Sequence, residues 1–210
     1  MNICSYEKEK RSADMFWSRI AGIYDLIENV YNGKANRRTT DHVASLMDEG
    51  DRVLECACGT GMFSVKIAPR VKELTATDFA DGMLKRTKRK CRNFENVTAE
   101  KADITKLRFE DDTFDKAVAA NVIHLLDDPA KAIAELKRVV KPGGLIIIPT
   151  YIHFGASKAA NLFNKAGAGF KRHFDENSYR EFFKEMGIEN VSYHVCEGRM
   201  ACDVAVFENR

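Results

Sequence analysis

Residues 53–61 read Val-Leu-Glu-Cys-Ala-Cys-Gly-Thr-Gly, and they are the most informative part of this sequence. An apolar strand ends in a carboxylate at Glu55, a loop of small residues follows, and a helix is expected to open at Met62. Glycine lets the backbone pass close to a ligand, because it tolerates dihedrals and contacts that a Cβ would block. Open α/β sheets bind ligands at the carboxyl ends of their parallel strands. The stretch therefore predicts a cofactor pocket at a strand end.

Two kinds of cofactor compete for such a loop. A dinucleotide site favours Gly-x-Gly-x-x-Gly with the pyrophosphate at the helix N-terminus, but Ser64 stands where the third glycine would be. Glu55 would repel a pyrophosphate and would attract a ligand that carries an ammonium group. S-adenosylmethionine carries an ammonium and a sulfonium and no phosphate, so the electrostatics favour it over a dinucleotide.

The stretch resembles motif I of the class I S-adenosylmethionine-dependent methyltransferases, in which an acidic residue precedes x-Gly-x-Gly-x-Gly. This chain departs from the motif at Ala57, where the first glycine is usual, and we expect the added methyl to be tolerated although it crowds the methionyl end of the cofactor. The resemblance covers about residues 50–150. It implies that the cofactor contacts Glu55, Ala57, Cys58, Gly59 and Gly61.

Two later segments are similar to further motifs of the same family. In residues 77–84, Asp78 would accept both ribose hydroxyls, while Phe79 and Met83 would pack on the adenine. In residues 102–104, Asp103 would accept a hydrogen bond from the adenine amino group and Ile104 would flank the ring. Core packing remains an alternative for Phe79, and a turn or N-cap role remains one for Asp103.

Asn121 and His124 follow the fourth expected strand, beside the expected position of the sulfonium. The sequence Asn-Val-Ile-His differs from the Asn/Asp-Pro-Pro-aromatic pattern of nucleic-acid amino methyltransferases, which disfavours that substrate class. His124 is a candidate catalytic residue, since imidazole titrates near neutral pH. It serves either as a general base or, as we favour, to shape the pocket.

Tyr24 is the second candidate catalytic residue. Residues 16–25 resemble the N-terminal segment of the quinone-biosynthesis and phospholipid-amine methyltransferases. In that group an aromatic-plus-Asp pair opens a helix that forms a lid over the site. The resemblance implies that Tyr24 reaches the cofactor or acceptor, and packing of an amphipathic helix is the alternative.

Strand and helix patterns alternate along the chain, which predicts a parallel sheet wound with helices. Helices are expected at residues 12–31, 35–47, 62–67, 80–91, 129–140 and 176–186. Strands are expected at residues 53–55, 74–77, 97–102, 114–120, 145–148, 191–196 and 201–207. The family resemblance implies a Rossmann-like, doubly wound seven-stranded sheet, mostly parallel with the last strand antiparallel, plus N-terminal lid helices.

We expect one domain over residues 1–210. It comprises a helical lid (1–48), a cofactor-binding core (49–150), and an acceptor-side insert with a closing helix and hairpin (151–210). The 210 residues are 45% hydrophobic and 30% charged with a net charge of +2, so neither nucleic acid nor a membrane is expected as an obligate partner. No apolar run is long enough for a membrane span and no signal-peptide core precedes the first helix, so a cytoplasmic monomer or homodimer is expected.

The six cysteines are interpreted as small buried apolar residues. Cys56 and Cys58 lack the spacing and the second ligand pair of a zinc site, so no metal is expected. Six cations between residues 85 and 92 are interpreted as a solvated helix face, with RNA contact as the alternative.

The expected activity is methyl transfer from S-adenosylmethionine to a small apolar or aromatic acceptor. The lining expected from the first helix and the insert is aromatic, lightly basic and poor in acids: Phe16, Trp17, Tyr24, Tyr151, His153, Phe154, Phe163, Phe170 and His173. The alternatives are a phospholipid-amine or RNA methyltransferase, a nicotinamide-dependent oxidoreductase, and a non-catalytic cofactor-binding partner subunit.

Overall fold

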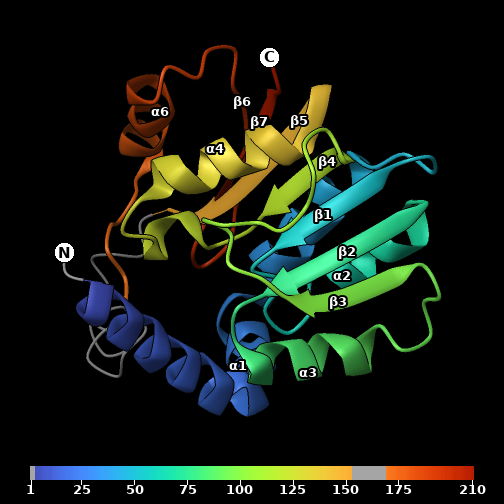
Figure 1. Cartoon of the computed structure of the whole chain (residues 1–210), viewed down its shortest axis with the longest axis vertical. Helices are drawn as coiled ribbons and strands as arrows, with labels where there is room; N and C mark the ends of the chain where they lie inside the picture. The colour runs from blue at the N-terminus through green and yellow to red at the C-terminus, as the bar shows by residue number, and fades with distance from the viewer. Residues whose placement is uncertain (1–2, 153–168) are drawn as a thin grey trace.

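The computed structural model describes residues 3–152 and 169–210, and a seven-stranded sheet in the order β3-β2-β1-β4-β5-β7-β6 lies at its centre (Figure 1). The strands are β1 Arg52–Cys56, β2 Glu73–Asp78, β3 Val97–Lys101, β4 Phe114–Ala119, β5 Val140–Tyr151, β6 Ser192–Cys196 and β7 Cys202–Glu208. β1 to β5 pair in parallel, whereas β7 runs antiparallel to β5 and β6. The predicted mostly parallel sheet with a reversed last strand is confirmed.

Helices cover both faces of this sheet (Figure 1). They are α1 Ile3–Ser45, α2 Ser64–Ile67, α3 Asp81–Lys90, α4 Pro129–Val139 and α6 Glu176–Glu185. α4 and α6 pack on one face, and α2 and the second half of α1 pack on the other. The apolar run Ile146–Ile148 is fully buried, as a central strand covered on both faces requires. Because both faces are covered, we expect a ligand to bind at the edge of the sheet formed by the carboxyl ends of the parallel strands.

The largest differences from the predicted boundaries are at α1, α2 and the junction of α4 with β5. α1 begins at Ile3 rather than at residue 12, and α2 begins at Ser64 rather than at Met62. α4 ends at Val139 and passes directly into β5 at Val140, so Pro142 lies inside a strand and not in a loop. A Cβ on Gly144 would lie 2.4 Å from the Asp115 carbonyl oxygen, so glycine is what allows β5 to approach β4 here.

The predicted break at Asn32 is a kink within α1 rather than a loop, with φ −137° and ψ 19° at that residue. The Asn32 side chain explains it, since its Nδ2 donates to the Met200 carbonyl and its Oδ1 accepts from the Met200 amide, both at 2.9 Å. The kink is therefore fixed by the turn that joins β6 and β7.

The described cysteine thiols are free and buried: Cys56, Cys58, Cys91, Cys196 and Cys202. Burial raises the pKa of Cys56 to about 12 and that of Cys91 to about 11, so these thiols stay protonated at neutral pH. Their interpretation as buried apolar residues is confirmed. Within residues 3–152 and 169–210, no helix is long and apolar enough to cross a membrane.

The first half of α1 packs on α3 through a close backbone contact at Gly82. The Gly82 amide donates to Ser18 Oγ at 3.0 Å, and Ala21, Ala80 and Met83 are buried beside it. A Cβ on Gly82 would lie 2.6 Å from both the Cα and the carbonyl oxygen of Ser18. Backbone atoms cannot move aside as a flexible side chain can, so this contact positions the lid helix.

We predict that Gly82→Ala separates α1 from α3 and lowers the free energy of unfolding by about 1–3 kcal/mol, the usual cost of overpacking. Urea denaturation would measure this loss of stability. Gly22→Ala at the same interface is the matched control, because its Cβ would meet only the mobile end of Arg86 at 3.3 Å. That control should be neutral or should gain up to about 1 kcal/mol from helix propensity. Equal stabilities of the two variants would refute the close-contact role.

Candidate active site

The loop after β1 turns sharply at the carboxyl edge of the sheet. Three of its residues have positive φ: Ala57 at 53°, Gly59 at 56° and Gly61 at 82°. A side chain at such a φ costs about 1–2 kcal/mol, because the Cβ crowds the following carbonyl. Ala57 thus bears backbone strain that a glycine would avoid. This strain explains why the family usually has glycine at this position, which could not be seen from the sequence.

Hydrogen bonds from β2 and α3 hold this loop in place. The Cys58 amide donates to the Thr77 carbonyl at 2.9 Å, the Gly59 amide donates to Asp78 Oδ2 at 2.8 Å, and Thr87 Oγ1 donates to the Gly59 carbonyl at 2.8 Å. A Cβ on Gly59 would meet no atom within 4 Å, whereas one on Gly61 would lie 3.1 Å from Thr87 Oγ1. The loop therefore packs tightly against α3 at Gly61 and leaves free space at Gly59. This space fits a ligand that approaches the loop backbone.

Two buried carboxyl groups flank the loop. Glu55 is 1% exposed and accepts a hydrogen bond from Ser64 Oγ at 2.6 Å. Burial raises its pKa to about 8, and the negative charge of Asp78 adds to the effect. Asp78 is 5% exposed and accepts from the amides of Gly59 and Ala80, and burial raises its pKa to about 6. A cationic ligand would lower the cost of ionising both groups, so the residues present fit S-adenosylmethionine.

Of the other residues predicted on the adenine side, Phe79, Asp103 and Ile104 follow the ends of β2 and β3, and Met83 lies in α3. Asp103 Oδ1 accepts from the Thr105 amide at 2.9 Å and from its hydroxyl at 2.8 Å, which is the turn role anticipated as an alternative. Ile104 is 7% exposed in the large core cluster. Met83 is 3% exposed and packs on Ala21 and Ala80, and Phe79 is half-buried. An adenine contact by these four residues remains a prediction.

The cofactor loop is also tied to the lid helix. Thr60 Oγ1 donates to Asp25 Oδ1, and Lys90 Nζ lies 2.8 Å from the same carboxylate. Asp25 follows Tyr24, so the aromatic-plus-Asp pair of α1 contacts both the loop and α3. A ligand that moves this loop would act directly on α1.

Asn121 joins the ends of β4 and β5. Its φ is 51°, its amide donates to the Pro149 carbonyl at 2.8 Å, and its Oδ1 accepts from the Tyr151 amide at 3.0 Å. These bonds fix the strand ends against each other and place Tyr151 at the edge of the sheet. A sulfonium contact by Asn121 remains a prediction.

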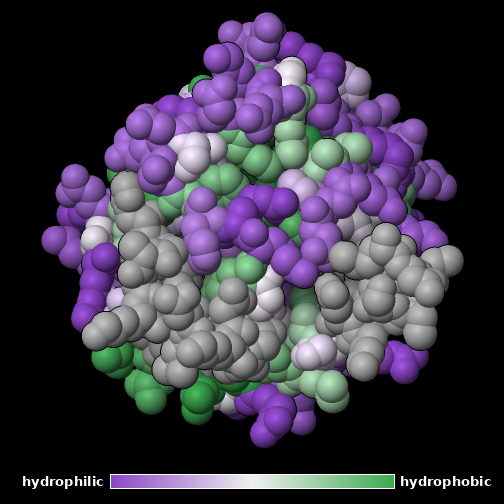
Figure 2. All heavy atoms as spheres, turned by 90° about the vertical axis from the view of Figure 1, so that its left-hand side faces the viewer, coloured by the Kyte–Doolittle hydropathy of each residue, from purple (hydrophilic) through white to green (hydrophobic). Residues whose placement is uncertain are grey.

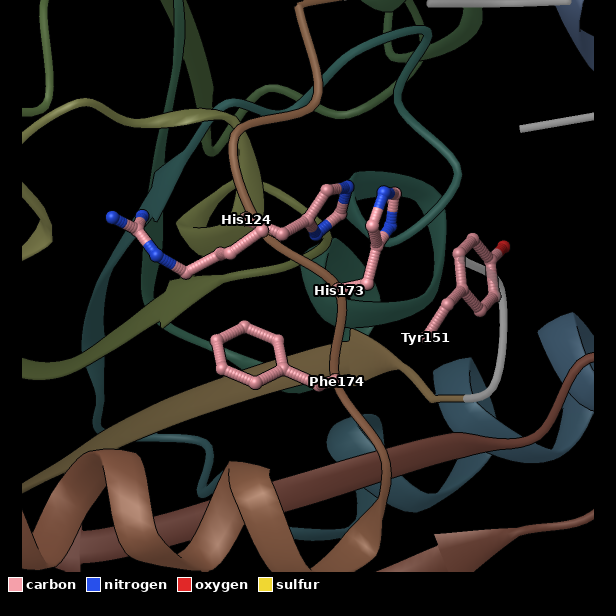
Figure 3. Close-up of a pocket in the computed structure, with 5 residues that line it drawn as sticks. His124, Tyr151, His173 and Phe174 are labelled. Carbon is pink, nitrogen blue, oxygen red and sulfur yellow. The ribbon is translucent and has the colours of Figure 1, made fainter. Parts of the chain in front are cut away.

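A cavity lies beside these strand ends, lined by His124, Tyr151, Arg172, His173 and Phe174 (Figure 3). The imidazoles of His124 and His173 lie next to each other, and Tyr151 reaches the cavity from the end of β5 (Figure 3). Arg172 holds this wall in shape, because its Nη1 donates to the carbonyls of Ile123 and Leu126 at 3.1 and 2.6 Å. The cavity thus combines aromatic surfaces with basic groups.

His124 is 8% exposed and its Nδ1 is buried with no hydrogen-bond partner. Burial, with a smaller contribution from the neighbouring His173 and Arg172, lowers its pKa to about 3. The imidazole is therefore neutral at physiological pH and a weak base. Its ring stacks on Phe170, with centroids 5.3 Å apart. Of its two predicted roles, these features favour shaping the pocket.

Glu28 and Asn36 are site residues that the sequence analysis missed. The Tyr151 hydroxyl lies 2.8 Å from Glu28 Oε2 and 2.6 Å from Asn36 Oδ1, and Asn36 Nδ2 donates to Glu28 Oε2 at 2.9 Å. Burial, followed by the charge of Glu28, raises the pKa of both Tyr24 and Tyr151 well above the usual value. The expectation of a lining poor in acids overlooked Glu28, although its place one helical turn after Tyr24 was a usable signal.

The remaining predicted lining residues divide into three groups. On α1, Phe16, Trp17 and Tyr24 form a row of edge-to-face contacts, with centroids 5.1 and 6.0 Å apart. Phe170 and His173 lie beside His124, with their own centroids 6.2 Å apart. His153, Phe154 and Phe163 lie outside the described residues.

Comparisons with known proteins agree with this geometry. Residues 54–148, from β1 to β5, match the family described as "Methyltransferase domain". The fold is similar to that of a SAM-dependent methyltransferase from Thermotoga maritima, with a TM-score of 0.73 and 19% identity over 93% of this chain and 99% of that one. Together these findings support a class I S-adenosylmethionine-dependent methyltransferase, a class whose cofactor is S-adenosylmethionine.

Within this class the chain is similar to demethylmenaquinone methyltransferases. It is 33% identical to the one from Paenarthrobacter aurescens and 31% identical to the one from Renibacterium salmoninarum, over 73% of its own length in both cases. These matches span 60% and 64% of the two relatives, which is less than two thirds of their length. The one from Bacillus licheniformis is 27% identical over 92% of this chain and 95% of that protein.

We predict that Glu55 makes the stability of the ligand-free protein fall as pH rises from about 4.5 to about 8. Over this window the folded state keeps the Glu55 proton while the unfolded chain loses it, so the slope is negative. Glu55→Gln removes this ionisation and should gain roughly 1–3 kcal/mol relative to the wild type between pH 5 and pH 8.

Urea denaturation at several pH values would measure the difference. Glu181→Gln, which removes an exposed carboxylate from α6, is the control for the loss of one charge. Parallel pH profiles of Glu55→Gln and the wild type would contradict the burial argument.

Proposed function

We propose that this protein transfers a methyl group from S-adenosylmethionine to a small aromatic acceptor of the quinol class. The observation that carries the proposal is the group of aromatic and basic side chains, His124, Arg172, His173 and Phe174, that lines the cavity at the ends of β4 and β5. Its aromatic walls suit an apolar ring, and its basic groups suit an acidic hydroxyl. The names of the demethylmenaquinone methyltransferases to which the chain is similar support this choice.

The cofactor side is assigned to residues at the ends of β1, β2, β3 and β4 and to Met83 in α3. Glu55 binds the ammonium group, Asp78 accepts the ribose hydroxyls, and Gly59 and Gly61 let the backbone come close. When bound, S-adenosylmethionine supplies a methyl group on a sulfonium that is already activated. The remaining cofactor contacts of the proposal are Ala57, Cys58, Phe79, Met83, Asp103, Ile104 and Asn121.

The residues on the acceptor side have to orient a ring carbon toward the methyl group and accept the proton that this carbon loses. Ionisation of a ring hydroxyl makes the neighbouring ring carbon nucleophilic, and the positive charge of Arg172 favours the ionised form. Neutral His124 shapes the wall of the cavity through its stacking on Phe170. After the carbon–carbon bond forms, the ring carbon must lose its proton, and Glu28 is placed to receive it through the hydroxyl of Tyr151. Positioning of this kind supplies on the order of 7–11 kcal/mol of a barrier.

A second candidate acceptor is an amine, such as a phospholipid headgroup. The Glu28 carboxylate lies beside the hydroxyl of Tyr151 and near Tyr24, and a carboxylate with aromatic neighbours suits an ammonium group. The basic groups around His124 oppose a cation in the adjoining cavity. We therefore rank the amine second.

We predict turnover of reduced naphthoquinols when methyl transfer is screened over phenols, quinols, amines, thiols and RNA. Tyr151→Phe removes the hydroxyl next to Glu28 and should lower kcat about tenfold, with the affinity for S-adenosylhomocysteine unchanged. Tyr193→Phe on β6 is the matched control, since Tyr193 packs on Arg180 under α6 and should leave kcat unchanged. Turnover confined to RNA or to hydrophilic amines would refute the quinol assignment.

A further inference from the structure

The outer face of α1 exposes a row of large apolar side chains. Met15, Ile23, Leu26 and Val30 are 63%, 56%, 66% and 77% exposed, and they are the large hydrophobic residues that the described part of the chain leaves open to solvent. At 3.6 residues per turn, all four project within about 80° of one another around the helix axis. Hydrophobic side chains gather along the lower edge of the molecule in the view of Figure 2, at the level where α1 lies in Figure 1.

The charges around this row have one sign. Between residues 11 and 30 the exposed charged residues of α1 are Arg11 and Arg19, and Arg19 projects from the middle of the row. The guanidinium of Arg86 reaches the edge of the row from α3, because it lies beside Gly22.

The acids of the same helix segment turn inward instead. Asp14 pairs with Lys101 at 3.1 Å and Asp25 pairs with Lys90 at 2.8 Å. Glu28 lies in the hydrogen-bond cluster with Tyr151. The outer face is therefore apolar and cationic, with the negative charge of the helix held on the other side.

Packing within the chain does not explain why the outer face of α1 is apolar and cationic. A surface helix that packs on a core through one face usually carries polar residues on the opposite face. The inner face of α1 already packs through Trp17, Ile20, Ala21 and Tyr24. Single exposed apolar residues are ordinary, but a contiguous row of them marks an interaction site. An apolar row flanked by arginines matches an interfacial helix, in which apolar side chains enter the bilayer and the arginines extend to lipid phosphates.

We propose that α1 docks this protein on the surface of an anionic bilayer, through Met15, Ile23, Leu26 and Val30 with Arg11, Arg19 and Arg86. The inference rests on the proposed function, because an apolar quinol acceptor partitions into lipid. The inner face of the same helix carries Tyr24 and Glu28, so a docked α1 places the acceptor cavity next to the membrane surface. The helix lies along the interface and does not cross it.

Cosedimentation of the full chain with lipid vesicles tests the proposal. The chain should bind vesicles of phosphatidylcholine and phosphatidylglycerol in a ratio of about 2:1, and binding should weaken in high salt as the anionic surface is screened. Vesicles of phosphatidylcholine alone should bind it less. The double variant Leu26→Asp/Val30→Asp should lower the partition coefficient at least about tenfold, and Arg19→Glu should lower it severalfold.

Lys184→Glu, a charge reversal at a side chain on α6 that is 80% exposed, is the matched control and should bind like the wild type. Circular dichroism melting should show the same unfolding temperature for every variant, because each replaced side chain is exposed. Equal binding by the double variant and the wild type, or no binding by the wild type, would overturn the proposal. So would a wild-type dimer in analytical ultracentrifugation that the double variant converts to a monomer without loss of vesicle binding.

Activity assays separate this proposal from the proposed function. With a short-chain, water-soluble quinol the double variant should retain the wild-type kcat, whereas with a long-chain quinol in vesicles its turnover should fall with its binding. Vesicle binding without turnover of any quinol would refute the proposed acceptor and leave the docking intact. Turnover of quinols without vesicle binding would refute the docking alone.

Discussion

The burial of Glu55 at the end of β1 constrains everything around it. A carboxyl group that is 1% exposed loses its hydration, and the Ser64 hydroxyl replaces only a part of it. Asp78, at the end of the neighbouring strand, is buried as well and holds the cofactor loop through the Gly59 amide. The negative charge of Asp78 adds to the effect of burial in raising the pKa of Glu55. A ligand with a positive charge would lower the cost of ionising Glu55.

α1 connects this site to the rest of the molecule. It is pinned at Gly82 of α3, at Thr60 of the cofactor loop, and at Met200 in the turn between β6 and β7. Beyond the kink, Asn36 joins the same cluster as Glu28 and Tyr151. The helix thus contacts both the loop after β1 and Tyr151, which lines the cavity, while its outer face remains apolar. Thr60 and Tyr151 are therefore connected through a single element.

The sequence was sufficient for features that depend on neighbouring residues. Glu55, Asp78 and Asp103 each lie at or just after the end of an expected strand, so their position at the sheet edge could be predicted. Features that depend on contacts between residues far apart in the sequence could not be predicted. Glu28 lies 123 residues before Tyr151, and the role of Arg172 depends on carbonyls of residues 123 and 126. The direct connection of α4 to β5 could not be predicted because Pro142 is typical of a loop. The close approach of Gly144 to β4 explains why the strand begins before this proline.

Calorimetric titration with S-adenosylhomocysteine at pH 7, in buffers of different ionisation enthalpy, tests the cation-binding role of Glu55 most directly. With a pKa of about 8, Glu55 holds its proton in the free protein, and an ammonium group beside it should expel that proton. We expect release of about one proton per ligand bound by the wild type and almost none by Glu55→Gln. Equal proton release by the two proteins would contradict this role of Glu55.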